Sequence, residues 1–331
     1  MNKKLKVLEV LDCYYPNVDG PIEVMNNIAR SFESCGFGEV ELLVPDYPER
    51  IEPEGLKIHR SKSVPTRGGY RAALPFLDAS VKKLIKKGGF DIIHLHSPFT
   101  LSRYALKLGK KYGIPVVMTV HTKFRDEVDN LVKSKGLRKF VMNYILKCID
   151  GCDGITSVCR GMKDTLGEYG SKRVDDVKVI YNATDMPRGG ADPENVRAIR
   201  EKHALDGVTA FIFAGRLVEA KNVQFSLNVL GELKKRGVSD FKFLIIGEGV
   251  YGKTLKALAE KLGISENVEF VGKITDKKLL AEYYSACDLL LFPSVFDNGS
   301  IVLLESAANG LPSATVAGSC SAERIENGVN G

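Results

Sequence analysis

The chain has 331 residues, of which 44% are hydrophobic, enough for two domains of ordinary size. No run is long and apolar enough to span a membrane, and the first residues lack the apolar region and cleavage site of a signal peptide, so we expect a cytoplasmic protein. The seven scattered cysteines, an odd number, indicate neither a disulfide framework nor a zinc site.

The net charge of +6 is unevenly distributed. Residues 1–186 hold 30 Lys and Arg against 23 Asp and Glu, whereas residues 187–331 hold 17 against 18. The basic excess predicts an anionic partner or surface for the first part of the chain. Charged helix faces in contact with water are the alternative explanation.

Strands and helices alternate through the first part of the chain. The stretch KVLEVLD (residues 6–12) predicts a buried strand, and a turn-rich segment separates it from a helix over residues 22–33. Further strands are predicted at residues 40–44, 58–60, 91–96, 116–120, 154–158 and 177–181, and helices at 74–87 and 101–112. This order is typical of a parallel sheet covered by helices.

The composition is looser over residues 182–206, which contain Pro187 and Pro193, and we place a domain boundary there. The predicted domains are 1–186 and 187–331. In the second, strands are expected at 210–214, 241–246, 268–271 and 289–292, and helices at 224–235, 251–262 and 279–286. The chain stops in turn residues, so we expect the second domain to be incomplete at its C-terminus. The fold class is therefore α/β, with two Rossmann-like doubly wound parallel sheets whose ligand binds in a cleft at the strand ends.

Residues 296–312 (FDNGSIVLLESAANGLP) combine two acids with a helix start. We predict a helix from near Ser300, with Asp297 in the preceding loop and Glu305 within the helix. Amides at a helix start bind phosphate, so the backbone from Gly299 to Val302 is a candidate phosphate site, beside which Glu305 would reach a ribose. The alternative is a capped core helix whose two acids face solvent.

Two cations, Arg216 and Lys221, follow the strand predicted at 210–214. At the carboxyl end of a strand they would stabilise a diphosphate as it leaves a sugar. An ion pair with Glu219 is the alternative.

Histidines also occur at strand ends. His121 follows the strand at 116–120, where a side chain can meet a substrate hydroxyl. His94 and His96 share one face of their strand, but no third metal ligand follows at a suitable spacing, so we favour structural histidines and predict no metal site. Gly20 in the first strand-to-helix loop, and Gly247 with Gly249, form only parts of a dinucleotide-binding motif, so a nicotinamide enzyme fits poorly.

The stretch that begins at Val132 and ends at Ile149 alternates basic and apolar residues. Such a helix can lie on an anionic bilayer, which would place the protein at the inner face of the membrane. A helix that packs on its own domain has the same pattern.

Several motifs together resemble the family-4 retaining glycosyltransferases. FDNGSIVLLESAANGLP is similar to their E-x7-E segment, and AGRLVEAKNV to their phosphate-clamp segment. DIIHLHSPF, VVMTVHTKF and VIYNATD match in order and spacing, so the resemblance runs from Lys6 to the last residue. It implies a GT-B fold, an acceptor-binding first domain and a donor-binding second domain, and metal-independent hexosyl transfer from a UDP- or GDP-linked sugar to a lipid or lipid-linked glycan. No cofactor and no nucleic-acid partner are expected.

The resemblance also implies roles for individual residues. Arg216 and Lys221 would hold the diphosphate, Asp297 the transferred sugar and Glu305 the ribose, while His121 would contact the sugar near the reacting centre. Donor-binding residues would further include Gly20, Gly247, Gly249, Asn298, Gly299, Ser300, Ile301 and Val302. Asp297 stands where most members have Glu, and Asp19 precedes Gly20 where many have a second glycine, so the donor sugar stays open. Two other functions remain: a nucleotide-sugar epimerase of the same architecture, and a non-catalytic, truncated member that only binds a partner.

Overall fold

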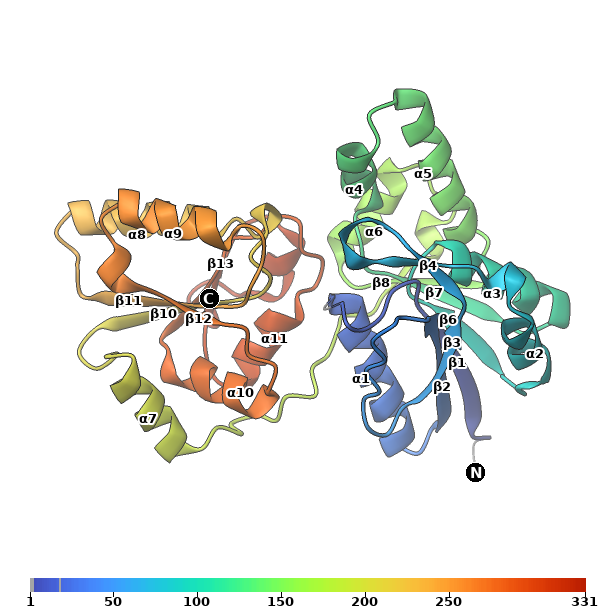
Figure 1. Ribbon diagram of the computed structural model, residues 1–331, viewed down its shortest axis with the longest axis horizontal. Helices are drawn as coiled ribbons and strands as arrows, with labels where there is room; N and C mark the ends of the chain where they lie inside the picture. The colour runs from blue at the N-terminus through green and yellow to red at the C-terminus, as the bar shows by residue number, and fades with distance from the viewer. Residues whose placement is uncertain (1–2, 18) are drawn as a thin grey trace. The chain divides into compact units, whose positions relative to one another are not determined.

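The computed structural model describes residues 3–17 and 19–331, which form two compact units, Met1–Ala183 and Thr184–Gly331. Each unit contains a parallel sheet with helices on both faces (Figure 1). The predicted α/β class with two doubly wound sheets is therefore confirmed. The division lies slightly before the expected one, since Met186 is buried in the core of the second unit.

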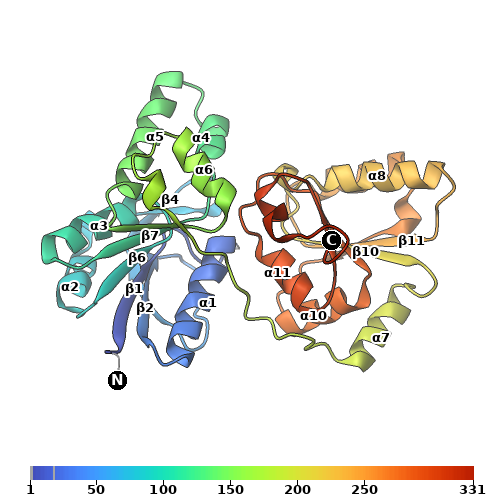
Figure 2. The same ribbon diagram turned by 180° about the vertical axis from the view of Figure 1, so that it is seen from behind.

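The first unit is built on a seven-stranded sheet in the order β3-β2-β1-β6-β7-β8-β9. Helices α2 and α3 lie on one side of this sheet and α1 on the other (Figures 1 and 2). Its strands are β1 (Leu5–Val10), β2 (Gly38–Pro45), β3 (Lys57–Ser61), β6 (Ile92–Leu95), β7 (Val116–Val120), β8 (Gly154–Ser157) and β9 (Lys178–Val179). Its helices are α1 (Gly20–Ser34), α2 (Ala79–Lys87), α3 (Thr100–Tyr112), α4 (Phe124–Leu131), α5 (Lys135–Ile149) and α6 (Arg160–Glu168).

Two local predictions for the first unit were wrong. No strand was predicted between the strand at 58–60 and the helix at 74–87, but this segment contains an antiparallel hairpin of β4 (Ser63–Pro65) and β5 (Arg71–Ala73). The helix expected from residue 74 begins only at Ala79, because the Asp78 side chain accepts a hydrogen bond from Ser80 N and caps it there.

The second unit has a five-stranded sheet in the order β12-β11-β10-β13-β14. Helices α8 and α9 lie over one face and α7, α10 and α11 over the other (Figures 1 and 2). Its strands are β10 (Thr209–Ala214), β11 (Phe241–Ile246), β12 (Val268–Gly272), β13 (Leu289–Phe292) and β14 (Ser313–Thr315). Its helices are α7 (Pro193–Lys202), α8 (Val223–Lys235), α9 (Gly252–Lys261), α10 (Lys277–Ala286) and α11 (Ile301–Ala308).

Both sheets reverse their strand order beside their first strand. In the first unit β2 and β3 lie on one side of β1 and β6 on the other; in the second, β11 and β12 lie on one side of β10 and β13 on the other. The loops at the carboxyl ends of the two central strands diverge there, which is where ligands bind in open α/β sheets. Functional side chains are therefore expected in the loops that follow β1 and β6 in the first unit, and in those that follow β10 and β13 in the second.

Candidate functional site

In the second unit, the loops that follow β10 and β13 lie against each other at the point where the strand order reverses. The Asn222 amide donates to Pro293 O (3.3 Å), and the Ser294 hydroxyl donates to Ala220 O (3.3 Å). These bonds join two loops that lie more than seventy residues apart in the chain. They hold the segment after Ala214 beside the segment that leads into α11.

A lysine and an aspartate meet between these two loops. Lys221 Nζ donates to Asp297 Oδ1 at 2.6 Å, and their side chains are only 21% and 20% exposed. Of the two cations for which an ion pair with Glu219 was the alternative, Lys221 pairs with Asp297 instead. The other carboxylate oxygen, Asp297 Oδ2, is buried and has no hydrogen-bond partner within the described residues. A shielded carboxylate oxygen without a donor costs free energy, so the site suits a ligand that supplies a hydroxyl.

The segment after Asp297 folds as predicted. Helix α11 begins at Ile301, Ser300 is its N-cap, and the Ser300 side chain does not accept a hydrogen bond from the first amides of the helix. Gly299 has a φ of 75°, a conformation that favours glycine. The chain therefore enters the helix through a left-handed residue, and the helix start follows directly after the Lys221–Asp297 pair.

Glu305 lies within α11 and is half-buried. Its Oε2 accepts a hydrogen bond from the hydroxyl of Tyr284 on α10, at 3.3 Å. Tyr284 is fully buried, and burial together with the neighbouring Glu305 raises its pKa well above 10, so the hydroxyl keeps its proton. The alternative in which both acids face solvent is wrong: Asp297 is paired, and Glu305 is held by a core tyrosine.

Arg216 and the two glycines of the β11 loop belong to one backbone arrangement. A Cβ at position 247 would lie 1.9 Å from Gly215 O, and one at position 249 would lie 2.2 Å from Leu217 O. Only glycine allows the two loops to approach this closely, and Leu217 N donates to Glu248 O at 2.9 Å. Gly247 and Gly249 thus shape the loop that carries the exposed Arg216; their contact with a donor stays a prediction.

In the first unit, the ends of β1 and β6 carry the other candidate residues. Gly20 is the first residue of α1, and the carboxylate of Asp19 before it accepts a hydrogen bond from the Tyr70 hydroxyl at 2.7 Å. Asp12, just beyond β1, accepts hydrogen bonds from Leu101 N and from the Ser102 hydroxyl (2.6 and 2.7 Å). Asp12 thereby caps α3 from a different strand, and its burial raises its pKa.

His121 is buried just after β7, and its Nε2 lies 2.9 Å from His96 Nδ1. On its other side His96 is hydrogen-bonded through Nε2 to the carboxylate of Glu9, which also binds His94 Nδ1 at 3.1 Å. The sequence analysis did not single out Glu9, although an acid within the otherwise apolar run VLEVL (residues 7–11) was a signal. One hydrogen-bonded cluster therefore connects Glu9, His94, His96 and His121.

Glu9, His94 and His96 offer ligand atoms within 4.8 Å of one another, so a third potential metal ligand exists on a different strand. In this arrangement both imidazoles already bond to the carboxylate. Burial alone would raise the pKa of Glu9, but His94 and His96 beside it lower that pKa to about 2. The geometry is that of a hydrogen-bonded cluster, and the prediction that transfer uses no metal stays a prediction.

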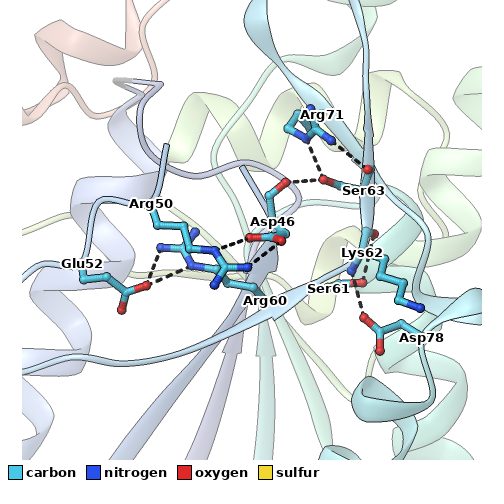
Figure 3. A network of polar contacts seen from close by, with 9 residues as sticks. All are labelled: Asp46, Arg50, Glu52, Arg60, Ser61, Lys62, Ser63, Arg71 and Asp78. Carbon is cyan, nitrogen blue, oxygen red and sulfur yellow. Dashed lines mark hydrogen bonds and ion pairs between the residues drawn. The ribbon is translucent and has the colours of Figure 1, made fainter. Parts of the chain in front are cut away.

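The first unit also contains a polar pocket of about 660 Å³ beside the β4–β5 hairpin. Figure 3 shows the polar contacts of several of its lining residues: Arg50 pairs with Asp46 through two bonds (3.0 and 2.9 Å), and Arg71 donates to the hydroxyl and the carbonyl of Ser63 (2.8 and 2.9 Å). Lys62 also lines the pocket. The lining thus carries more positive than negative charge, in line with the basic excess of this part of the chain.

Helix α5 has two different halves. The second half packs into the first unit through Met142, Ile145 and Ile149. The first half exposes Leu137 (51%) and Phe140 (66%) beside several basic residues. Packing on its own domain therefore accounts for only part of the amphipathic pattern. Among the described residues, no helix has the length and hydropathy needed to cross a bilayer.

Each of the two units matches a model of a known protein family. The model described as Glycosyltransferase Family 4 matches residues 19–188, and the model described as Glycosyl transferases group 1 matches residues 195–331.

Two curated relatives are similar over most of the chain. The alpha-monoglucosyldiacylglycerol synthase of Streptococcus pneumoniae is 26% identical and aligns with 91% of this chain and 68% of its own length. The GDP-mannose-dependent alpha-(1-6)-phosphatidylinositol dimannoside mannosyltransferase of Mycobacterium tuberculosis is 24% identical and aligns with 93% of this chain and 78% of its own. Among solved structures, Anabaena HepE in complex with UDP has a TM-score of 0.75 at 16% identity, over 99% of this chain and 85% of HepE. That similarity establishes a shared fold.

Proposed function

The chain belongs to the family-4 glycosyltransferases with the GT-B fold, and on that premise we propose that it transfers a hexosyl group from a nucleotide sugar to a lipid or lipid-linked acceptor, with retention of anomeric configuration. The observation that carries the proposal is the Lys221–Asp297 pair with its second, unpartnered carboxylate oxygen. A carboxylate of this kind accepts a sugar hydroxyl, and the adjacent ammonium stabilises negative charge on a leaving diphosphate.

The candidate residues of the second unit bind the nucleotide-sugar donor. Lys221 and Arg216 hold the diphosphate, the amides from Gly299 to Val302 at the start of α11 assist them, and the carboxylate of Glu305 accepts the ribose hydroxyls. Asn298 and Ser300 belong to the same loop and line the donor. These cations supply positive charge where a metal ion would otherwise be needed, so the reaction needs no metal.

We assign the acceptor to the first unit. Its basic pocket beside the β4–β5 hairpin suits an anionic group, and the two relatives named above are described as acting on lipids. In this unit His121 contacts the transferred sugar, and Gly20 lines the phosphate side of the first loop. The donor is UDP- or GDP-linked: the mycobacterial relative is named as GDP-mannose-dependent, and HepE was solved with UDP.

The experiment that tests the proposal combines donor binding with transfer. UDP, GDP, UDP-glucose and GDP-mannose are added separately to the protein during thermal unfolding, where a donor at 100 times its Kd adds about 2.7 kcal/mol. Transfer to diacylglycerol in vesicles is then measured with and without EDTA, and the anomer of the product is determined by NMR. We expect protection by one nucleotide series and a retained anomer despite EDTA.

Other outcomes of this experiment contradict the proposal. Interconversion of two sugar nucleotides without acceptor would identify an epimerase. Vesicle binding without protection by any nucleotide would identify a non-catalytic member. An inverted product, or transfer abolished by EDTA, would remove the retaining or the metal-independent assignment.

We further propose that the protein acts in the cytoplasm at the inner face of the membrane, where the first half of α5 contacts anionic lipid. Leu137 and Phe140 would enter the headgroup region while the neighbouring lysines face the lipid phosphates. Phe140→Ser should lower co-sedimentation with phosphatidylglycerol vesicles several-fold. The matched control is Phe225→Ser, which removes another exposed phenylalanine (54%) from α8 in the second unit. Equal loss in both variants, or equal binding to phosphatidylcholine, would contradict the assignment.

A further inference from the structure

A chain of hydrogen-bonded polar side chains, most of them buried, crosses the central strands of the first sheet. Glu9 of β1 is the register partner of His94 on β6, and Thr119 of β7 is the register partner of Thr156 on β8. Because alternate residues of a strand share a face, His94 and His96 lie on the same side of the sheet, as do Thr119 and His121. Glu9 thus reaches His121 through His96, and Thr156 through His94 and Thr119.

The direction of the hydrogen bonds follows from the charge of Glu9. Its pKa is lowered to about 2, so Glu9 is a carboxylate at neutral pH, and a carboxylate only accepts hydrogen bonds. The nitrogen of His96 that faces it, Nε2, must therefore carry the hydrogen. Burial and the neighbouring His94 lower the pKa of His96, so His96 is a neutral imidazole whose Nδ1 is an acceptor.

His121 is oriented in turn. The His96 Nδ1 acceptor lies 2.9 Å from His121 Nε2, and the two ring planes differ by 23°, which suits an in-plane N–H···N bond. Burial, together with His96 and His94, holds the pKa of His121 well below its ordinary value. His121 is therefore a neutral ring with its hydrogen on Nε2, and its Nδ1 carries a lone pair.

We propose that Glu9 is a positioning residue for the transfer reaction: acting through His96, it fixes His121 as the tautomer whose Nδ1 accepts a hydrogen bond from a hydroxyl of the transferred sugar. The inference rests on the proposed function. A carboxylate imposes one direction on the whole chain of bonds. A glutamine amide can donate as well as accept, so Glu9→Gln permits the reversed chain, in which His121 Nδ1 carries the hydrogen and no longer accepts.

The kinetic test compares Glu9→Gln with a matched control. Glu41 is a second buried glutamate, on the adjacent strand β2; it bonds to His59 Nε2 at 2.6 Å and to Lys57 at 2.7 Å. We expect Glu9→Gln to lower kcat about 10-fold with the donor KM changed less than about 3-fold, since the reversed tautomer weakens a bond that matters in the transition state. Glu41→Gln should leave kcat unchanged. Equal kcat in the wild type and a folded Glu9→Gln variant overturns the proposal.

A spectroscopic test does not depend on turnover. Selective ¹⁵N labelling reports which ring nitrogen bears hydrogen in each of the five histidines. In the wild-type protein at pH 7 we expect His121 neutral with hydrogen on Nε2, a state that Glu9→Gln shifts and Glu41→Gln does not. Hydrogen on Nδ1, or an imidazolium, in the wild type overturns the proposal even where Glu9→Gln does not fold. Absence of transfer by the wild type with every donor would refute the proposed function, whereas the tautomer of His121 is measured separately.

Discussion

The two units differ in how their buried carboxylates are satisfied. In the first unit, Glu9 accepts hydrogen bonds from two imidazoles, and Asp12 accepts from backbone and hydroxyl groups of α3. In the second unit, Asp297 Oδ1 accepts a hydrogen bond from Lys221. Its other oxygen, Oδ2, is buried without a partner among the residues that the structure describes. This difference agrees with the proposal that a hydroxyl of the donor binds Asp297 in the second unit, whereas the carboxylates of the first unit are bound by its own groups.

The largest effect should come from breaking the incomplete site. Lys221→Ala removes the charge beside the leaving diphosphate and leaves Asp297 unpaired, so we expect kcat to fall by roughly 10² or more, the usual scale for a preorganised charge partner. The measurement is transfer from the nucleotide sugar that protects the wild type against thermal unfolding. Lys235→Ala removes an exposed lysine of α8 as the control. Near-normal transfer by Lys221→Ala would show that the second unit is not completed in this way.

A smaller effect is expected at the ribose end. Glu305→Gln replaces a charged acceptor by a neutral one, which weakens a hydrogen bond to a hydroxyl and should raise the Kd of the nucleotide about 10-fold. Calorimetric titration with UDP or GDP measures this Kd. Glu260→Gln, an exposed acid on α9, is the control. Unchanged nucleotide affinity would place the ribose away from Glu305.

Tyr284→Phe sharpens the comparison further, because it removes the hydrogen bond from the tyrosine hydroxyl to Glu305, at 3.3 Å, while keeping the core aromatic ring. We expect the Kd of the nucleotide to rise only about 3-fold, since Glu305 loses orientation and keeps its charge. Tyr251→Phe, at the N-cap of α9, serves as the control. A larger loss than in Glu305→Gln would mean that the tyrosine itself meets the nucleotide.

The smallest effect on transfer is expected in the first unit, where Glu41 contributes stability that is present at neutral pH and is lost in acid. Burial alone would raise the pKa of Glu41, but its bonds to Lys57, Lys6 and His59 lower it from 4.5 to about 2. A carboxyl whose folded pKa is depressed contributes stability above the unfolded pKa and loses it as the pH falls through the folded value. The difference in unfolding free energy between wild type and Glu41→Gln should therefore shrink between about pH 4.5 and pH 2. Denaturant unfolding across this range measures it, and a constant difference would contradict the assignment.

Much of the fold was predictable because its signals are local. Apolar runs separated by turn residues gave the order of strands and helices, and the helix start after Asp297 follows from the change of period at Ser300. The misplaced start of α2 is a local failure, since Asp78 was a visible N-cap residue. The β4–β5 hairpin was hidden because its strands are only three residues long.

The sequence by itself therefore determined the α/β class, the two units and the residue types available for a nucleotide sugar. Only the tertiary structure decided which of those residues meet. Lys221 and Asp297 are 76 positions apart and become neighbours because β13 lies beside β10, and Glu9 reaches His121 because β1, β6 and β7 are adjacent. Strand order arises from the packing of the whole sheet and leaves no local pattern in the chain, so neither the ion pair nor the histidine cluster could be predicted from spacing.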